Sequence, residues 1–325
     1  MTRRTIRILI GIAVSAGLLY LVLRNVSPAE LLSHLSRTHW GWLGLSVAAH
    51  LAMVVARGVR WALFFHPAAP ASRPLVSATA IGFMGNNLLP LRAGELLRAY
   101  LAARSTGLSF WTALATLAVE RVLDAFSILL ILGGVVVVVK VPLWLKTAAL
   151  TFLAIDLLAM GMLILLAREW GPLNRWVMRI PRLGVTVRRW LALFAIGLQS
   201  LRAGPHLGPL LAWSVLIWVV NAGAVWAAFR SIGLALPVSA SLTVLAFTGI
   251  AVSLPSAPGY VGTVQFFIVQ ALAIYAVTGV EAVSFSFLYH AAGFIPLTLL
   301  GWAFLLAQGV SLRTATEQAR AEAHQ

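Results

Sequence analysis

Three ionisable residues lie close together in an otherwise apolar part of the chain. The segment NNLLPLRAGELLRAY, residues 86–100, holds Arg92, Glu95 and Arg98 between long apolar runs. The planar guanidinium groups of the two arginines suit phosphate, because their donors match its oxygens. A helix over residues 94–105 would add its N-terminal amides as an anion site. Glu95 would then orient an arginine or bind a cationic group.

Two asparagines and a glycine complete this polar segment. Asn86 and Asn87 precede Pro90, which lacks an N–H and frees a carbonyl in the preceding turn. The asparagine amides can satisfy such freed backbone groups, or they can hydrogen-bond a polar headgroup. Gly94 is expected to allow a sharp turn and a close backbone approach.

A second charged group lies inside a long apolar run. The segment AVERVLDAF, residues 118–126, places Glu120 and Asp124 on one helix face and Arg121 three residues before Asp124, within pairing distance. Each unpaired charge at the centre of a membrane helix costs roughly 2.5–3.5 kcal/mol. These side chains must therefore pair, face protein or face water.

Two interpretations fit these charges. In the first they brace the helices, through pairs such as Arg121 with Glu95 or Arg92 with Glu120. In the second they bind substrate. The desolvation of a buried ion pair can exceed its attraction, so a purely stabilising role would be served better by leucine. The sequence therefore favours function for these four residues, with Asp124 as a partner of Arg121.

Another Pro- and Gly-rich break, PSAPGYVG at residues 255–262, supplies backbone and no charge. The candidate substrate-binding residues here are Pro255, Pro258, Gly259, Gly262 and Gln265. His290 is interpreted as a packing residue. Asp156 could pair with Arg121 or face the same cavity.

The composition places these residues in a membrane. Of 325 residues, 61% are hydrophobic and 10% charged, whereas soluble domains carry about a quarter charged residues. The chain is expected to be a single all-α polytopic membrane domain, residues 1–325. The absence of cysteine excludes disulfides and thiolate chemistry. We expect no cofactor or metal. The net charge of +15 is assigned to cytoplasmic loops and to anionic lipid headgroups at that face, and not to nucleic acid.

Apolar runs predict six spanning helices and two broken regions. The spans are 6–23, 41–64, 110–139, 144–167, 209–229 and 281–307, and the broken regions are 76–105 and 238–278.

Loop charges predict the orientation. The most basic loop, 168–205, is placed in the cytoplasm with both termini, and Arg57, Arg60 and Arg73 are interpreted as a cytoplasmic cluster. Each broken region is then a re-entrant hairpin or a pair of full spans. Loop charges do not separate these two options.

The two broken regions resemble one another. FMGNNLLPLRAG (83–94) and FTGIAVSLPSAPG (247–259) share the order Phe-x-Gly, apolar stretch, Pro and Gly. They would enter from opposite sides, so repeats 41–167 and 209–307 are predicted to be inverted. Matching broken helices in two inverted halves indicate a transporter's substrate site.

At these motifs the chain resembles the lysylphosphatidylglycerol synthase transmembrane-region, or flippase-like, family. The segments that carry the resemblance are GNNLLPLRAGELLRAYLAAR (85–104), ATLAVERVLD (115–124) and LPSAPGYVGTVQ (254–265). Tyr260 stands where the family usually has glycine, which bears on the shape of that turn but not on the hairpin. The resemblance implies movement of lipids, often anionic or lipid-linked, between leaflets, and we expect a phospholipid or lipid-linked anionic headgroup as the substrate. The expected location is the cell (plasma or inner) membrane. Because the chain ends about eighteen residues after its last span, no soluble lysyl-transfer domain is expected.

We therefore expect a lipid flippase and not an enzyme. No Walker A sequence indicates ATP hydrolysis. The alternatives are an intramembrane lipid-modifying transferase, with Glu120 or Asp124 as a base, and a structural or regulatory membrane protein. The sequence leaves open whether the chain forms a homo-oligomer.

Overall fold

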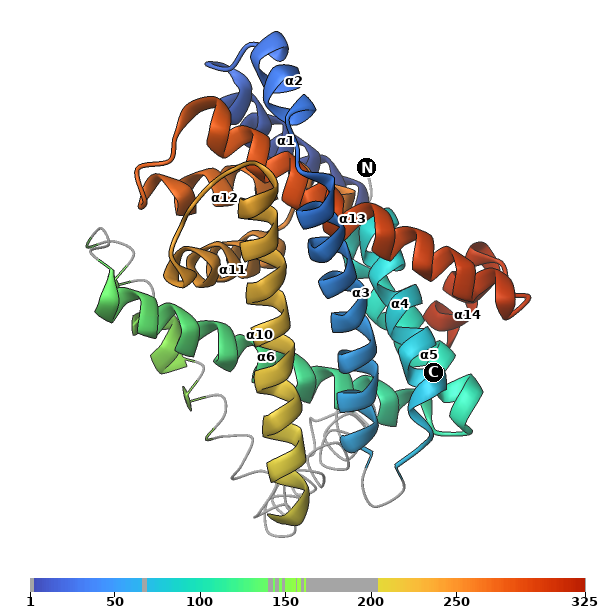
Figure 1. Cartoon of the computed structure of the whole chain (residues 1–325). Coiled ribbons are helices and arrows are strands. Elements are labelled where there is room, and N and C mark those ends of the chain that lie inside the picture. The colour runs from blue at the N-terminus through green and yellow to red at the C-terminus, as the bar shows by residue number, and fades with distance from the viewer. Residues whose placement is uncertain are drawn as a thin grey trace.

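The computed structural model describes residues 3–65, 69–139 and 204–324, with some positions between 143 and 161. All regular secondary structure in these residues is helical (Figure 1). Most of the predicted span 144–167, nearly all of loop 168–205, and Asp156 lie outside the described residues.

Four helices of the described part are long and apolar enough to cross a membrane. They are α3 (Trp40–Leu63), α6 (Phe110–Val138), α10 (Gly204–Ser231) and α13 (Gly279–Ala307), and each matches a predicted span. The long apolar face of α6 is directed outward: Val137 and Val138 are 86% and 78% exposed. The chain is therefore a multi-pass membrane protein.

The first predicted span, 6–23, lies within a helix that is followed by a sharp bend. Helix α1 (Arg3–Leu23) turns by 80° into α2 (Pro28–Ser36), and this pair is a fifth candidate span if it is counted as one. A capping box fixes the start of α2, where Ser27 accepts from the Glu30 backbone and Glu30 accepts from the Ser27 backbone.

The two breaks occur where the sequence predicts them. Helix α4 (Ser72–Leu88), the short helix η1 (Pro90–Arg92) and α5 (Gly94–Thr106) form the first hairpin. Helix α11 (Val238–Ser253), η3 (Pro258–Tyr260) and α12 (Thr263–Ala273) form the second. Proline drives the preceding residue out of the helical region, and Leu89 and Ala257 are extended, with ψ of 143° and 156°.

The described helices follow the same order twice. The order α3, α4, η1, α5, α6 has lengths of 24, 17, 3, 13 and 29 residues, and α10, α11, η3, α12, α13 has lengths of 28, 16, 3, 11 and 29. Each hairpin also packs on the long helix of the other set, α4 on α13 and α11 on α6.

Helices α3 and α10 lie side by side and antiparallel (Figure 1). His39, just before α3, donates its backbone N–H to the Ser231 carbonyl at the end of α10, at 2.7 Å. The end of α3 and the start of α10 therefore lie at the same end of the molecule.

Each hairpin has its own apolar core. Trp61, Leu97 and Leu117 are buried in the first, and Phe247 and Phe285 in the second. The C-terminal helix α14 (Leu312–His324) packs on α5, where the Tyr100 hydroxyl bonds the Gln318 side chain.

Candidate functional site

A buried ionic network joins α3, α5 and α6. Glu120 is fully buried and accepts hydrogen bonds from both terminal nitrogens of Arg98, each at 3.0 Å. Arg121 donates to the same carboxylate at 2.5 Å. Glu120 therefore ties α5 to α6 in the interior of the helix bundle.

Asp124 is the second carboxylate of the network. Arg57 Nη1 lies 2.6 Å from its Oδ2, and Arg60 Nη2 lies 2.8 Å from its Oδ1. Arg60 also donates to the Ser214 hydroxyl at 3.2 Å, which brings α10 into the same cluster.

The prediction that Arg57 and Arg60 form a charged cluster with Arg73 at the end of α3 is therefore wrong, because both are buried inside the helix bundle and paired with Asp124. Their exposed fractions are 7% and 0%, because they lie three residues apart on one face of α3 and meet the carboxylates of α6. The counting of positive charges took them as an orientation signal at the end of the span 41–64, without asking which carboxylates they could meet. Their spacing, and their place before the end of the predicted span, were signals of the intramembrane pairing.

Some predicted ion pairs form and one does not. Arg121 lies 3.9 Å from Glu95 and 3.5 Å from Asp124, so both of its predicted pairings are present. The predicted pair of Arg92 with Glu120 is wrong, since Arg98 occupies that position. Arg98 lies on the buried face of α5 and also stacks over Trp61, 4.1 Å from the ring centroid. Its terminal nitrogens are thus committed to Glu120 and not left free for phosphate.

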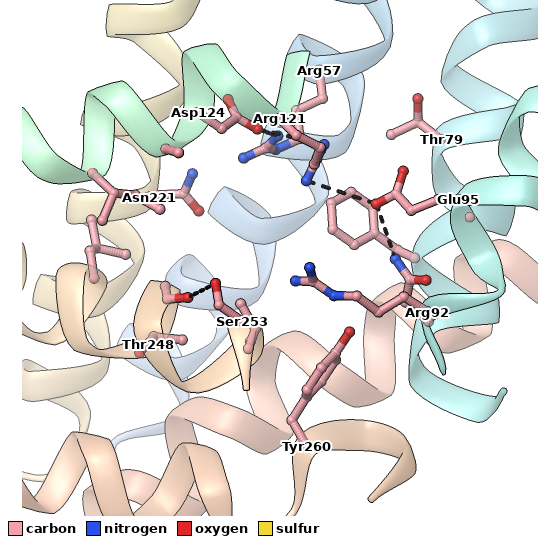
Figure 2. A pocket seen from close by; sticks show the side chains of 18 of the residues that line it. Arg57, Thr79, Arg92, Glu95, Arg121, Asp124, Asn221, Thr248, Ser253 and Tyr260 are labelled. Atoms are coloured by element: carbon pink, nitrogen blue, oxygen red, sulfur yellow. Dashed lines mark hydrogen bonds and ion pairs between the residues drawn. The ribbon is translucent and has the colours of Figure 1, made fainter. Parts of the chain in front are cut away.

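A cavity of about 450 Å³ lies beside this network (Figure 2). It collects predicted residues from both the first hairpin and α6: Asn86, Asn87, Arg92, Glu95, Arg98, Arg121 and Asp124. The opposite wall comes from α10, α11 and η3. Its polar residues are not among the predicted site residues: Trp218, Asn221, Thr248, Ser253 and Tyr260. Asn221, in the middle of an apolar run, was the clearest sequence signal of this wall.

Arg92 is the exposed arginine at the tip of the first hairpin. Its side chain extends into the space between Ser253, Tyr260 and Arg121 (Figure 2). It forms no ion pair or hydrogen bond with any residue that the structure describes. The cavity is lined by four arginines against two carboxylates, so its electrostatic balance favours an anion.

The two asparagines have different roles. The Asn86 amide donates to Glu95 Oε1 at 3.4 Å, within the hairpin. The Asn87 amide donates to the Thr298 hydroxyl at 2.8 Å and to the Phe294 carbonyl at 3.3 Å. Asn87 therefore joins the first hairpin to α13, a role beyond the predicted bonding of backbone groups freed by Pro90.

A second cavity, of about 540 Å³, adjoins the first between the two hairpin tips. Pro255 and Pro258 line it together with apolar residues such as Ile10 and Leu254. Asn86, Arg92, Ser253 and Tyr260 line both cavities, so these residues mark the junction.

Five predicted residues lie behind the cavities and line neither: Gly94, Glu120, Gly259, Gly262 and Gln265. Gln265 is buried, accepts from the Gly262 backbone at 2.7 Å and bonds His290 at 2.8 Å. Gly262 has a φ of 87°, and a Cβ there would meet the Ser15 carbonyl of α1. Gly262 and Gln265 therefore shape the second hairpin.

Tyr260 adopts the backbone conformation that glycine adopts easily. Its φ is 58°, and Gly259 beside it has a φ of 73°. The turn therefore keeps a left-handed shape at the position where the sequence departs from its motif.

A family model for the lysylphosphatidylglycerol synthase TM region matches residues 8–301. The chain belongs to this family. The predicted resemblance is therefore confirmed, and family membership places the protein among membrane domains related to lipids.

The chain also matches part of a curated protein. It is 26% identical over 136 residues to glycosyltransferase AglD of Haloferax volcanii, and these residues make up 41% of this chain and 22% of the relative. The match thus spans about a fifth of the relative's length. No solved structure matches the chain.

Proposed function

We propose that this protein moves lipids with an anionic headgroup between membrane leaflets. The proposal depends on one observation. The guanidinium of Arg92 extends into the cavity and has no partner among the described residues. A phosphate suits such a guanidinium, because its oxygens accept paired hydrogen bonds.

The ionic network supports this role by holding the site open. Arg57, Arg60 and Arg98 are fixed by Glu120 and Asp124, so the walls around Arg92 are set by buried bonds. The headgroup would enter the polar cavity while the tails stay in the bilayer and the adjoining apolar cavity.

Inverted repeats, residues 41–167 and 209–307, are part of the proposal. The repeated helix order and the crossed packing of each hairpin on the other set's long helix support them. Helices α5 and α12, of 13 and 11 residues, reach only roughly 20 and 17 Å at 1.5 Å per residue. This is short of the ~30 Å hydrocarbon core, which favours re-entrant hairpins over full-span pairs.

Single-cysteine labelling tests this topology, since the chain has no native cysteine. With both termini cytoplasmic, Arg73→Cys and Ser105→Cys should react with an impermeant maleimide from the cytoplasmic side, and Ala235→Cys from the outside. Leu88→Cys, near the first tip, should not react from outside. Outside labelling of Leu88→Cys would instead show a pair of full spans.

Reconstitution tests the function. Wild-type protein in liposomes should equilibrate a tail-labelled anionic phospholipid across leaflets, as followed by quenching of the outer-leaflet label. Arg92→Ala should slow this by about 10- to 100-fold, because a hydrogen-bonded charge contact is worth roughly 1.5–3 kcal/mol.

Arg73→Ala is the matched control, an exposed arginine at the start of the same hairpin and outside both cavities. It should flip lipid at the wild-type rate. Equal rates in wild type, Arg92→Ala and protein-free liposomes would contradict the proposal.

A second candidate function comes from the name of the relative, a glycosyltransferase. In that case the cavity would bind a lipid that is chemically modified. Lipid extracts from a strain lacking the protein separate the two functions. A missing lipid species indicates a transferase, and an unchanged inventory in the wrong leaflet indicates transport.

A further inference from the structure

The turn at the tip of the second hairpin, residues 259–262, is held by a histidine of α13. The Gly262 backbone N–H donates to Gln265 Oε1 at 2.7 Å, and Nε2 of the same amide lies 2.8 Å from His290 Nδ1. His290 also has a hydrogen bond with the Gly259 backbone. His290 therefore holds both ends of the turn, Gly259 directly and Gly262 through Gln265, which is more than the predicted packing role.

This chain of hydrogen bonds determines the protonation state of the His290 ring. A backbone N–H only donates, so the Gln265 atom that faces Gly262 is the carbonyl oxygen and the atom that faces His290 is the NH₂ group. His290 Nδ1 must then accept a hydrogen bond, and only a neutral imidazole can do so. The observed turn therefore requires an uncharged His290.

A proton on His290 Nδ1 is incompatible with the observed turn. It would place two donors against each other, because the Gln265 NH₂ group also donates. Turning the Gln265 amide over would only move the conflict to the Gly262 N–H. No orientation of this amide satisfies both neighbours once the ring is protonated.

The titratable side chains around His290 offer no negative charge. They are Tyr289 beside it on α13, Tyr260 in the turn, and His50 of α3, whose ring lies against Gly293.

The helices that pack on α13 are α2, α3, α4, α10 and α12. Their other titratable groups, among the described side chains, are Glu30 and His34 on α2, Arg57 and Arg60 on α3, Arg73 on α4 and Arg230 on α10. Glu30 accepts from the Ser27 backbone, and Glu281 of α13 itself lies in the first turn of that helix. A positive charge on His290 therefore has no counter-charge among these groups and must be solvated by water, which requires the turn to open.

The position of the turn sets the wall of the cavity that faces Arg92. Tyr260 lies in the turn, lines both cavities and points toward Arg92 (Figure 2). The turn also lies against the first hairpin, since a Cβ at Gly259 would be 3.4 Å from the Asn87 carbonyl oxygen. Opening of the turn would therefore separate Tyr260 from the Arg92 site.

We infer that His290 is a positioning residue: in its neutral form it holds Tyr260 beside the Arg92 site, and a proton on Nδ1 releases the turn. This inference rests on the proposed lipid transport and adds to it a dependence on proton concentration. Lipid movement is fast when His290 is neutral and slow when it is protonated.

The pH profile of lipid movement tests the inference. Wild-type proteoliposomes should move tail-labelled phosphatidylglycerol at least several-fold more slowly at about pH 4 than at about pH 8, a range that brackets the ordinary histidine pKa of about 6.5. The phosphodiester of this probe keeps its negative charge throughout. His290→Asn retains an acceptor oxygen near the position of Nδ1 but does not titrate, so its rate should stay close to the wild-type rate at about pH 8 and should not fall with acid. His290→Leu offers Gln265 no acceptor and should be about tenfold slower at both ends of the range.

His50→Asn is the matched control. His50 is also buried in the bundle, but its Nδ1 lies 2.8 Å from the Ser46 carbonyl oxygen, which only accepts. The ring can donate this hydrogen bond whether it is neutral or protonated. His50→Asn should therefore keep the wild-type loss of rate in acid.

A pair of spin labels follows the turn without any lipid substrate. Leu88→Cys and Val261→Cys place the labels on the two hairpin tips, at side chains that are 38% and 40% exposed, in a chain without native cysteine. The distribution of distances between the labels should broaden from about pH 8 to about pH 4 when His290 is present. It should stay unchanged when His290→Asn is added.

The outcomes separate this inference from the proposed function. A flat pH profile in the wild type, or the full acid loss retained in His290→Asn, overturns the inference and leaves lipid transport standing. If phosphatidylglycerol moves no faster than in protein-free liposomes at any pH, lipid transport fails. The spin-label distances then decide whether His290 controls the turn, and equal distributions at both pH values overturn that as well.

Discussion

Glu120→Gln is expected to lower the free energy of unfolding by about 3–5 kcal/mol, because it leaves buried guanidinium groups without their counter-charge. Glu120 is fully buried and accepts from Arg98 twice and from Arg121. Glutamine keeps the shape of the side chain but offers one acceptor oxygen and no charge. An SDS unfolding titration, followed by the fluorescence of the 12 tryptophans, measures the change.

Glu317→Gln is the control for this variant. Glu317 also pairs with an arginine, Arg313, at 2.9 Å, but both side chains are exposed on α14. Exposed pairs contribute little to stability, so the unfolding midpoint should stay at the wild-type value. Adding Arg98→Met to Glu120→Gln should recover part of the loss, since it removes one uncompensated charge. An unchanged midpoint in Glu120→Gln alone would contradict the role of the network as a brace.

Gly94→Ala is expected to destabilise the first hairpin by about 1–3 kcal/mol or more, which is the cost of overpacking. Helix α5 begins at Gly94 directly against α4. A Cβ there would lie 2.5 Å from the Asn86 backbone nitrogen and 2.6 Å from Asn86 Oδ1, and it would also meet the Gly82 carbonyl. Backbone atoms cannot move aside as a flexible side chain can, so the two helices must separate. The same unfolding titration measures the loss, and lipid movement should fall with it.

Gly134→Ala, on α6, is the control for this variant, because it is expected to keep or raise the stability of the protein. A Cβ at Gly134 meets nothing within 4 Å, and alanine favours a helix over glycine by roughly 0.8–1.0 kcal/mol. This variant should unfold at or above the wild-type midpoint. Equal unfolding midpoints for Gly94→Ala and Gly134→Ala would contradict the close contact between α4 and α5.

The two hairpin breaks could be predicted from the sequence because they depend on local rules. Pro90 and Pro258 force the preceding residue out of a helix, and Gly94 and Gly262 permit the close approach or positive φ that follows. The spanning helices were predictable for a similar reason, because a long apolar run needs no partner to identify it.

The pairing of charges was harder to predict, because it depends on which helix faces meet. Arg92 and Arg98 look alike in the sequence, yet Arg98 is bound by Glu120 and Arg92 lies at the exposed tip. Arg57 and Arg60 were counted as an exposed cluster although they are buried, because the counting of positive charges uses no information about neighbouring helices.

The sequence by itself determined a helical membrane protein, its two broken regions and the family to which it belongs, since composition, proline, glycine and motif order are local properties. Only the tertiary structure decided that Glu120 belongs to a buried brace while Arg92 faces a cavity, and that Trp218 and Thr248 form its opposite wall. Residues more than a hundred positions apart meet there through helix packing, and no spacing along one helix encodes that contact.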